Sequence, residues 1–236
     1  MTQSFTVTCT GKKEITRDVF ELRFTKPDDF EFDPGQFVLI DVPLASNPDD
    51  IQTRAYSIAS TPDEDELLLC IRKRPDGRMG QWLNKGLEEG TEVRIQGPLG
   101  NFRFDCENNK DCLFVATGVG MAPFRSQISS ALKSGNKQKM DLVVGMYSEK
   151  DIFWSDEFSA LAAQYPNFSF NITLSDPSPE WNGEKGWVQE IITKISDYKE
   201  RSFYICGNPS MTKNMKQLCL EDWNIPKEDV HVEGYI

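Results

Sequence analysis

The sequence contains very few of the residues that build metal and iron–sulfur centres. Its single histidine, His231, excludes a histidine-rich metal site, and we expect this residue to lie in an ordinary strand. The six cysteines form no C-x₂-C pair and no set of four with the spacing of an iron–sulfur centre. We therefore predict that the chain binds no metal, so that any iron–sulfur centre belongs to a separate protein.

Long apolar runs and a basic excess are also missing. No run can cross a bilayer as a helix, and the N-terminus lacks the basic-then-apolar pattern of a secretion signal, so we expect a cytoplasmic protein without direct membrane insertion. The net charge is −11 and both halves of the chain are acidic, which argues against nucleic-acid binding. We interpret the acidic surface as an aid to solubility, with a specific docking role as the alternative.

The first part of the 236-residue chain has the pattern of a small antiparallel barrel. Short alternating segments are separated by turn-forming clusters at 27–29, 33–35 and 47–50. One helix is expected at 80–85, before the last strand. The predicted strands lie at 5–10, 19–25, 36–42, 55–59, 66–72 and 92–96.

From about residue 110 onward, strands alternate with helices, which predicts a parallel sheet. The predicted strands lie at 112–116, 141–146, 168–174, 203–206 and 230–233. The predicted helices lie at 123–133, 155–164, 187–194 and 209–223. The polar, turn-like segment at 107–110 marks the boundary, and we predict domains at 1–106 and 107–236.

Residues 54–57, with the sequence R-A-Y-S, form the first candidate site. On a strand, alternation places Arg54 and Tyr56 on one face and Ser57 on the other. The guanidinium suits a phosphate, and the aromatic ring can stack on an isoalloxazine. The small hydroxyl can hydrogen-bond the edge of that ring system near its N5 atom. With Ala55, these residues predict a flavin site, and an ordinary surface strand is the alternative.

Two strand ends in the second part of the chain predict an edge that binds a pyrophosphate. The apolar segment at 112–116 runs into a glycine turn and then a helix, which places backbone N–H groups near an anion. The segment at 203–205 also ends in a glycine turn before a helix, and ligands of parallel sheets bind at such carboxyl ends. Plain strand-to-helix connections are the alternative. The residues expected at this edge are Thr117, Gly118, Gly120, Met121, Pro123, Cys206, Gly207 and Met211.

A basic segment beside the short helix predicts a second phosphate site. Three cations end the strand at 70–74, and another stands in the turn at 78–80 that opens the helix. A helix N-terminus flanked by arginines can bind a pyrophosphate, whereas the alternative is a basic, solvated hairpin. The residues assigned to this site are Ile71, Arg72, Lys73, Arg78, Met79 and Gly80.

These elements, in this order, resemble the ferredoxin–NADP reductase superfamily across the whole chain. Further segments resemble it too: P-G-Q-F at 34–37, G-P-L-G-N-F at 97–102, and W-N-G followed by G-W-V between 181 and 188. The resemblance implies a six-stranded antiparallel barrel that binds FAD, followed by a parallel-sheet domain that binds NAD(P). It also implies a single-flavin enzyme without a fused iron–sulfur domain.

The resemblance also implies roles for individual residues near the reacting atoms. Ser57 would lie near flavin N5. Cys206 would lie beside the hydride-transfer site, where its small side chain permits close approach and is not a nucleophile. Tyr235 would stack over the flavin and move aside for the nicotinamide, and Glu233 would place a carboxylate nearby without acting as a general base. A buried core cysteine and a frayed terminus are the alternatives for Cys206 and Tyr235.

Particular positions bear on the choice of each cofactor. Gly80 stands where relatives usually carry Ser or Thr, so a hydroxyl that assists a phosphate is missing, but the number of basic residues favours FAD over FMN. Ser175 and Asp176 replace the Ser-Arg of NADP-dependent relatives, and Met146 replaces another arginine. These replacements favour NADH, whereas Lys213 favours NADPH.

We therefore expect a flavin-dependent NAD(P)H oxidoreductase. It would pass hydride from the nicotinamide to bound FAD, and electrons on to a small protein carrier such as ferredoxin or flavodoxin. Two alternatives stay open: a flavin reductase that uses flavin as a substrate, and an electron-transfer subunit that is inactive without a partner. The acidic surface disfavours an acidic carrier unless the basic segment at 72–78 forms a local docking site.

Overall fold

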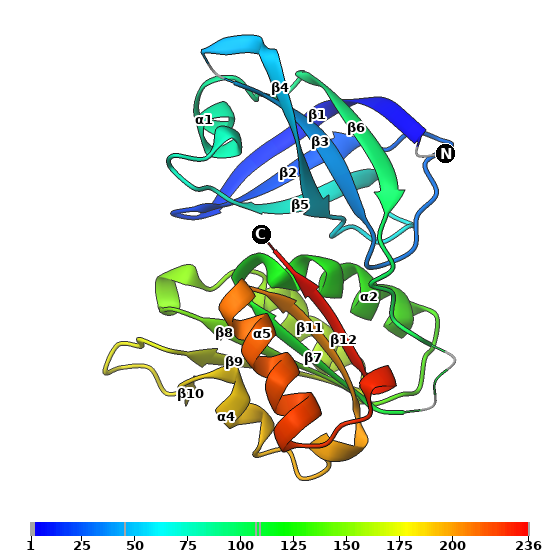
Figure 1. Ribbon diagram of the computed structural model, residues 1–236, viewed down its shortest axis with the longest axis vertical. Helices are drawn as coiled ribbons and strands as arrows, with labels where there is room; N and C mark the ends of the chain where they lie inside the picture. Colours follow the sequence, from blue (N-terminus) through cyan, green and yellow to red (C-terminus); the bar gives the residue numbers. More distant parts are fainter. Residues whose placement is uncertain (1–2, 45, 107, 109, 236) are drawn as a thin grey trace. The chain divides into compact units, whose positions relative to one another are not determined.

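The computed structural model describes residues 3–44, 46–106, 108 and 110–235. The chain divides into two compact units, Met1–Arg103 with Arg125–Gln127 and Phe104–Phe124 with Ile128–Ile236. Each unit has its own sheet and its own hydrophobic core (Figure 1). Two positions of the predicted boundary segment, Glu107 and Asn109, lie outside the described residues.

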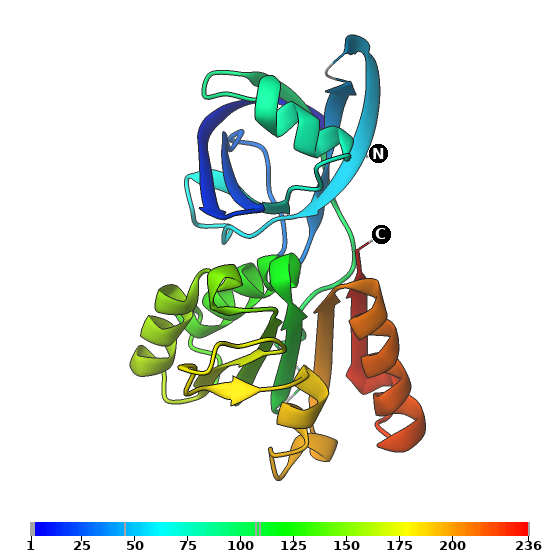
Figure 2. The same ribbon diagram turned by 90° about the vertical axis from the view of Figure 1, so that its left-hand side faces the viewer.

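The first unit is built on an antiparallel sheet in the order β4-β3-β6-β1-β2-β5. An isolated bridge between Ile58 and Leu69 links the two ends of the sheet, which curves into a barrel (Figure 2). This confirms the fold class predicted for the first part of the chain. The elements are β1 (Gln3–Thr16), β2 (Val19–Thr25), β3 (Phe37–Leu44), β4 (Asn47–Ser57), β5 (Glu66–Arg72), α1 (Arg78–Lys85) and β6 (Glu92–Leu99).

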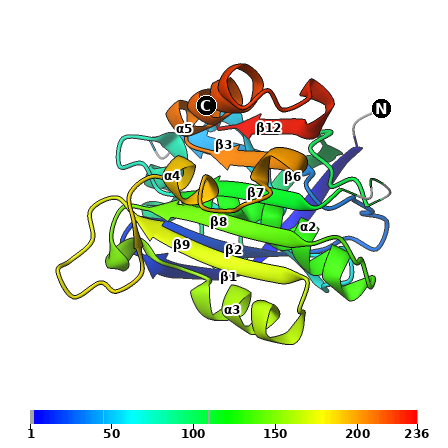
Figure 3. The same ribbon diagram turned by 90° about the horizontal axis from the view of Figure 1, so that it is seen from below.

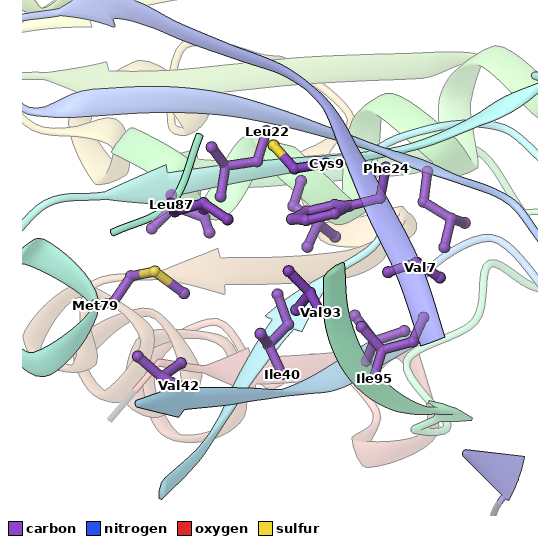
Figure 4. Close-up of a cluster of buried hydrophobic side chains, with 14 of the residues drawn as sticks. Val7, Cys9, Leu22, Phe24, Ile40, Val42, Met79, Leu87, Val93 and Ile95 are labelled. Atoms are coloured by element: carbon purple, nitrogen blue, oxygen red, sulfur yellow. The ribbon is translucent and has the colours of Figure 1, made fainter. Parts of the chain in front are cut away.

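The core of this barrel follows from alternation along the strands. Side chains two residues apart, such as Val7 with Cys9 on β1 and Leu22 with Phe24 on β2, enter one cluster and are at most 1% exposed (Figure 4). Met79 of α1 packs into the same cluster. The helix thereby packs against β3, the strand that pairs with the R-A-Y-S segment of β4.

β4 is longer than its sequence pattern predicts. The cluster at 47–50 is predicted as a turn, but it forms the first part of β4, with Asn47 opposite Leu44 and Ile51 opposite Pro43. Pro48 has no partner in the β3–β4 register, which shifts between Pro43 and Leu44, so its missing N–H costs this edge strand no ladder hydrogen bond. The prediction of a turn at 47–50 is therefore wrong, and the two strands form a long β3–β4 ribbon beside α1 (Figure 2).

The second unit contains a parallel sheet in the order β10-β9-β8-β7-β11-β12, which confirms the second predicted fold class. Figure 3 shows its strands β9, β8 and β7 side by side. Since all described strands of this sheet run the same way, their carboxyl ends share one edge. The strands are β7 (Cys112–Thr117), β8 (Met140–Met146), β9 (Phe168–Leu174), β10 (Glu184–Lys185), β11 (Ser202–Gly207) and β12 (Val230–Gly234). The helices are α2 (Met121–Lys133), α3 (Ser155–Gln164), α4 (Val188–Ile192) and α5 (Pro209–Gln217).

Helices cover both faces of this parallel sheet. On one face, Val115 of β7 packs in a cluster with Ile192 of α4 and Met215 of α5. On the other face, the ring of Phe114 lies 5.2 Å from that of Phe124 of α2. The side chains of adjacent residues on β7 thus pack against helices on opposite faces of the sheet, as expected for a strand that is buried on both sides.

Two details of the second unit differ from the predictions. The sequence pattern misses β10, because two residues carry no alternation. The helix predicted at 209–223 ends earlier, since α5 stops at Gln217 and the chain continues as a π-helical segment, Leu218–Asp222. In the described part of the chain, no helix is long and apolar enough to span a bilayer.

Candidate functional site

β4 presents the R-A-Y-S segment at its C-terminal end. Arg54 is exposed, and its guanidinium donates hydrogen bonds to the preceding carbonyl (2.8 Å) and to the side-chain oxygen of Gln52 (2.7 Å). Tyr56 is half-buried against the barrel core, and this burial raises the pKa of its phenol. Ala55 is exposed, whereas Ser57 is buried. Alternation therefore leaves Arg54 and Tyr56 on one side of the strand.

Three residues of the predicted basic site are engaged elsewhere in the first unit. The Arg72 guanidinium forms an ion pair with Asp18 at 2.9 Å. The Lys73 amine lies 5.2 Å from the centre of the Phe20 ring. Ile71 is buried in the barrel core, so its side chain serves packing rather than a ligand.

α1 begins at Arg78, two residues earlier than predicted, so that Met79 and Gly80 lie within the helix. No side chain caps its N-terminus and its first turn has no acidic residue, which suits the binding of an anion by backbone N–H groups. A Cβ built on Gly80 would lie 2.0 Å from the carbonyl oxygen of Arg74. The Arg74 carbonyl thus fills the space that a Ser or Thr side chain would need at position 80, which explains sterically why the hydroxyl is missing there.

Asp50 of β4 holds the Arg78 side chain. One guanidinium nitrogen lies 3.1 Å from the Asp50 carboxylate, and another donates to the backbone carbonyl of the same residue. Gln52 and Arg54 share one side of β4 by alternation, whereas Asp50 lies in the irregular stretch between the pairs Ile51–Pro43 and Asn47–Leu44. Two of the three predicted phosphate-binding arginines, Arg54 and Arg78, are therefore each hydrogen-bonded to groups of β4.

A cavity of about 280 Å³ lies between the β3–β4 ribbon and α1. Apolar side chains line most of it, with one cation at its edge. Its lining residues are Pro43, Leu44, Pro48, Trp82, Lys85 and Gly86. No sequence pattern reveals this cavity, because its lining comes from separate segments that meet only in the fold.

The carboxyl ends of β7 and β11 lie side by side in the second unit, because these strands pair in parallel. Thr117 accepts a hydrogen bond through its hydroxyl oxygen from the backbone N–H of Asn208 (3.0 Å). A Cβ on Gly120 would lie 2.3 Å from the Cys206 carbonyl oxygen, and one on Gly207, with φ 139°, would lie 2.4 Å from the Thr117 hydroxyl oxygen. Glycine at both positions allows the two predicted strand ends to meet.

The turn between β7 and α2 offers its backbone to a ligand. Gly118 has φ 54°, and nothing in the described chain lies within 4 Å of a Cβ built there. A 3₁₀ turn, Gly118–Gly120, leads directly into α2 at Met121, and neither the turn nor the helix has a side-chain cap or an acidic residue in its first turn, which suits a pyrophosphate. Met121 and Pro123 are buried, and Met211 belongs to the core beneath α5, so these three side chains pack inside the unit.

Cys206 is buried at this edge, and burial is the main cause that raises the pKa of its thiol. Glu233, opposite Cys206 in the β11–β12 ladder, raises it further, and a hydrogen bond with Tyr235 lowers it. Tyr235 donates from its backbone to the Gly207 carbonyl and from its hydroxyl to the Val119 carbonyl, both at 3.3 Å. Tyr235 thus lies over the glycine turn, held by backbone and side chain alike.

Thiol labelling should separate Cys206 from Cys106. Burial and Asp105 raise the pKa of the Cys106 thiol as well, but Cys106 is exposed and Cys206 is buried, so a thiol reagent should modify Cys106 rapidly compared with Cys206, which should react only after unfolding. Mass spectrometry after labelling with and without urea measures both. Cys106→Ser should remove the rapid phase. A rapid phase that survives this change and disappears in Cys206→Ala would contradict the burial.

The carboxyl ends of β8 and β9 carry a second polar edge, which the sequence reveals only in part. Ser175 and Asp176 are exposed, and their backbone N–H groups donate to the carbonyls of Met146 (3.1 Å) and Tyr147 (2.8 Å). Tyr147 is 59% exposed, and Trp187, which follows a residue bonded to the end of β9, is 66% exposed. The G-W-V motif contains Trp187, but its pattern alone indicates no ligand role for the ring.

Known proteins match both units. Residues 6–104 match the oxidoreductase FAD-binding domain family, and residues 114–217 match the oxidoreductase NAD-binding domain family. Ferredoxin–NADP reductase B of Sorangium cellulosum is 34% identical over 228 residues, which covers 92% of this chain and 91% of the relative. One component of the Na⁺-translocating NADH-quinone reductase of Neisseria meningitidis is 32% identical over 228 residues, which covers 87% of this chain and about half, 55%, of the relative.

Solved structures show the same fold. Cytochrome P450 reductase GcoB of Amycolatopsis has a TM-score of 0.87 and 26% identity, and the match covers 98% of this chain and 69% of that one. A ferredoxin NADP⁺ reductase from Neisseria gonorrhoeae, with bound FAD and NADP, has a TM-score of 0.83 and 20% identity, with 98% of each chain covered. At that identity the second likeness shows the fold alone.

Proposed function

Because the chain belongs to the ferredoxin–NADP reductase superfamily, we propose that its first unit binds FAD, that its second unit binds NADH, and that it reduces a small protein carrier. The chain is a flavin-dependent NAD(P)H oxidoreductase. When bound, FAD supplies the ability to accept a hydride and to release electrons one at a time. The residues of the chain bind and align the two cofactors.

The donor groups of the first unit fit a flavin nucleotide. Tyr56 offers an aromatic face, and Arg54 offers a guanidinium on the same side of β4. The uncapped N-terminus of α1 adds backbone N–H groups for a phosphate. We assign the stacking to Tyr56, the phosphate contact to Arg54, and the hydrogen bond at the flavin edge to Ser57.

The observation that carries the proposal is the close packing of the glycine turn against the end of β11. A Cβ on Gly120 would collide with the Cys206 carbonyl, and this approach sets the 3₁₀ turn Gly118–Gly120, which leads into α2, at the carboxyl edge of the sheet. A pyrophosphate bound there leaves the nicotinamide next to Cys206, whose small protonated side chain permits close approach. Glu233 and Tyr235 then border the nicotinamide, and Tyr235 must move to admit it.

The second polar edge is the proposed site of the adenosine half of NADH. Asp176 can accept hydrogen bonds from ribose hydroxyls and repels a 2′-phosphate. The backbone N–H of Asp176 donates a hydrogen bond to the Tyr147 carbonyl, which fixes the point on the backbone from which the carboxylate extends. The exposed rings of Tyr147 and Trp187 are suited to stack on a base.

A flavin reductase, which releases flavin as product, is the second candidate. The pairing of Arg78 with Asp50 favours it, because it reduces the positive charge offered to a diphosphate. A visible spectrum of the purified chain during anaerobic NADH titration tests the proposal. A flavin band that bleaches at one equivalent of NADH supports the bound-flavin enzyme, and a chain without such a band supports the flavin reductase. A band that persists would contradict the nucleotide assignment.

Replacing Tyr56 with Ala should weaken flavin binding about fivefold, because aromatic stacking contributes on the order of 1 kcal/mol beyond burial. Quenching of flavin fluorescence on titration with the protein gives the Kd. Tyr56→Phe keeps the ring and should bind flavin as the unchanged protein does. Equal Kd values for the Ala variant and the unchanged protein would rule out the stacking role.

A further inference from the structure

We propose that Asp50 withholds Arg78 from the flavin diphosphate and thereby sets how strongly the chain prefers FAD to flavins without a diphosphate. The proposal rests on the proposed flavin function of the first unit. It concerns a carboxylate that neither the R-A-Y-S segment nor the basic segment contains.

The contacts of Arg78 show how it is withheld. It is the first residue of α1, where a guanidinium would otherwise stand beside backbone N–H groups that suit an anion. Its side chain is only 10% exposed, while that of Asp50 is 44% exposed. Asp50 accepts two hydrogen bonds from the guanidinium, one at its carboxylate and one at its backbone carbonyl. A diphosphate at the start of α1 must therefore compete with Asp50 for the same nitrogens.

The surroundings of Arg78 add to this competition. Asp50 and Arg54, the other proposed phosphate ligand, belong to the same strand, β4, so the negative charge of Asp50 lies on a strand that would hold the diphosphate and disfavours its binding. The Arg74 carbonyl oxygen occupies the space beside Gly80 in the first turn of α1. Arg72 is paired with Asp18. The cations suggest a strong diphosphate site, but their acidic partners reduce its strength.

This arrangement predicts that the flavin ring contributes more to binding than the diphosphate does. FAD and riboflavin share the ring, so the ratio of their Kd values isolates the contribution of the phosphates and the adenosine. Removing the carboxylate removes a repulsion and one of the two contacts that hold Arg78, so that one guanidinium nitrogen becomes available for a charge-assisted hydrogen bond, while the contact with the backbone carbonyl remains. The expected effect is confined to flavins that carry phosphate.

The test is a fluorescence titration of the full chain, freed of flavin, with FAD and with riboflavin. Asp50→Ala should tighten FAD binding about fivefold and leave the Kd for riboflavin unchanged. Glu66→Gln is a matched control, because it also removes one negative charge paired with an arginine, Arg23, in the first unit. This control should change neither Kd. An unchanged ratio in Asp50→Ala, or selectively weaker FAD binding, overturns the proposal.

A double variant tests whether Arg78 carries the effect. In Asp50→Ala with Arg78→Met, the gain for FAD should disappear, and the Kd for riboflavin reports that the barrel remains folded. A gain that persists without Arg78 would make Asp50 a source of plain repulsion and overturn the inference. If the unchanged chain binds neither flavin, the proposed function fails together with this inference, whereas a failed ratio test removes the inference alone.

Discussion

Replacing Arg201 with Met should lower the free energy of unfolding of the second unit by about 3–5 kcal/mol, because it leaves a buried carboxylate without its main partner. Arg201 precedes β11, and its side chain is 1% exposed. It donates to the Asp141 carboxylate and makes two bonds of 2.8 Å to Asp197. Asp141 lies in β8 and is also buried, so its carboxylate would lose its main hydrogen-bond partner in a poorly solvated place.

Urea unfolding followed by tryptophan fluorescence measures this loss. Lys194→Met is the matched control, since it breaks an ion pair with Glu184 whose side chains are 58% and 44% exposed, and it should cost less than about 1 kcal/mol. Arg201→Met combined with Asp141→Leu should regain most of the loss, because replacing both members of a buried pair with apolar groups is often neutral. A single variant as stable as the control would show that the network adds nothing to stability.

Periodicity explains why so much of the fold follows from the sequence. The strands at 66–72 and 168–174 and the helix at 155–164 are predicted to the residue, because their apolar positions alternate or recur without interruption. The first half of β4 escapes prediction because Asn, Pro and Asp are turn formers, and they are accommodated here by the edge position of the strand and by the irregular β3–β4 register.

The parts of the site whose residues are adjacent in the chain can be predicted from the sequence. The parts that form by contacts between distant segments cannot. Two glycine turns at strand ends predict that Thr117 and Cys206 approach each other, since the ends of parallel strands share an edge. No local pattern predicts that Asp50 pairs with Arg78, 28 positions away. The sequence alone therefore overstates how strongly the basic segment can bind a diphosphate, because it does not reveal the acidic partners of the arginines. The choice between FAD and FMN consequently cannot rest on the charge of this segment alone.

Replacing Asp176 with Arg should shift the preference between the two nicotinamide nucleotides toward NADPH by about 10- to 100-fold in the ratio of kcat/KM values. The change replaces a carboxylate that repels a 2′-phosphate with a guanidinium that donates charge-assisted hydrogen bonds to it, each contributing about 1.5–3 kcal/mol. The expected shift is large because the Asp176 backbone is fixed to the end of β8 by its hydrogen bond to Tyr147. Steady-state rates with an artificial electron acceptor and each nucleotide give the ratio.

The control for Asp176→Arg must carry the same change of charge. Asp222→Arg provides it, because Asp222 is exposed and ends the π-helical segment beyond α5, whereas Asp176 follows β9. A shift in both variants would reflect the reduced overall negative charge of the protein rather than a contact of residue 176 with the ribose. A shift in Asp176→Arg alone, made up mainly of a lower KM for NADPH, would place the 2′-position of the ribose at Asp176. An unchanged ratio would remove Asp176 from the nucleotide site and with it the main support for NADH.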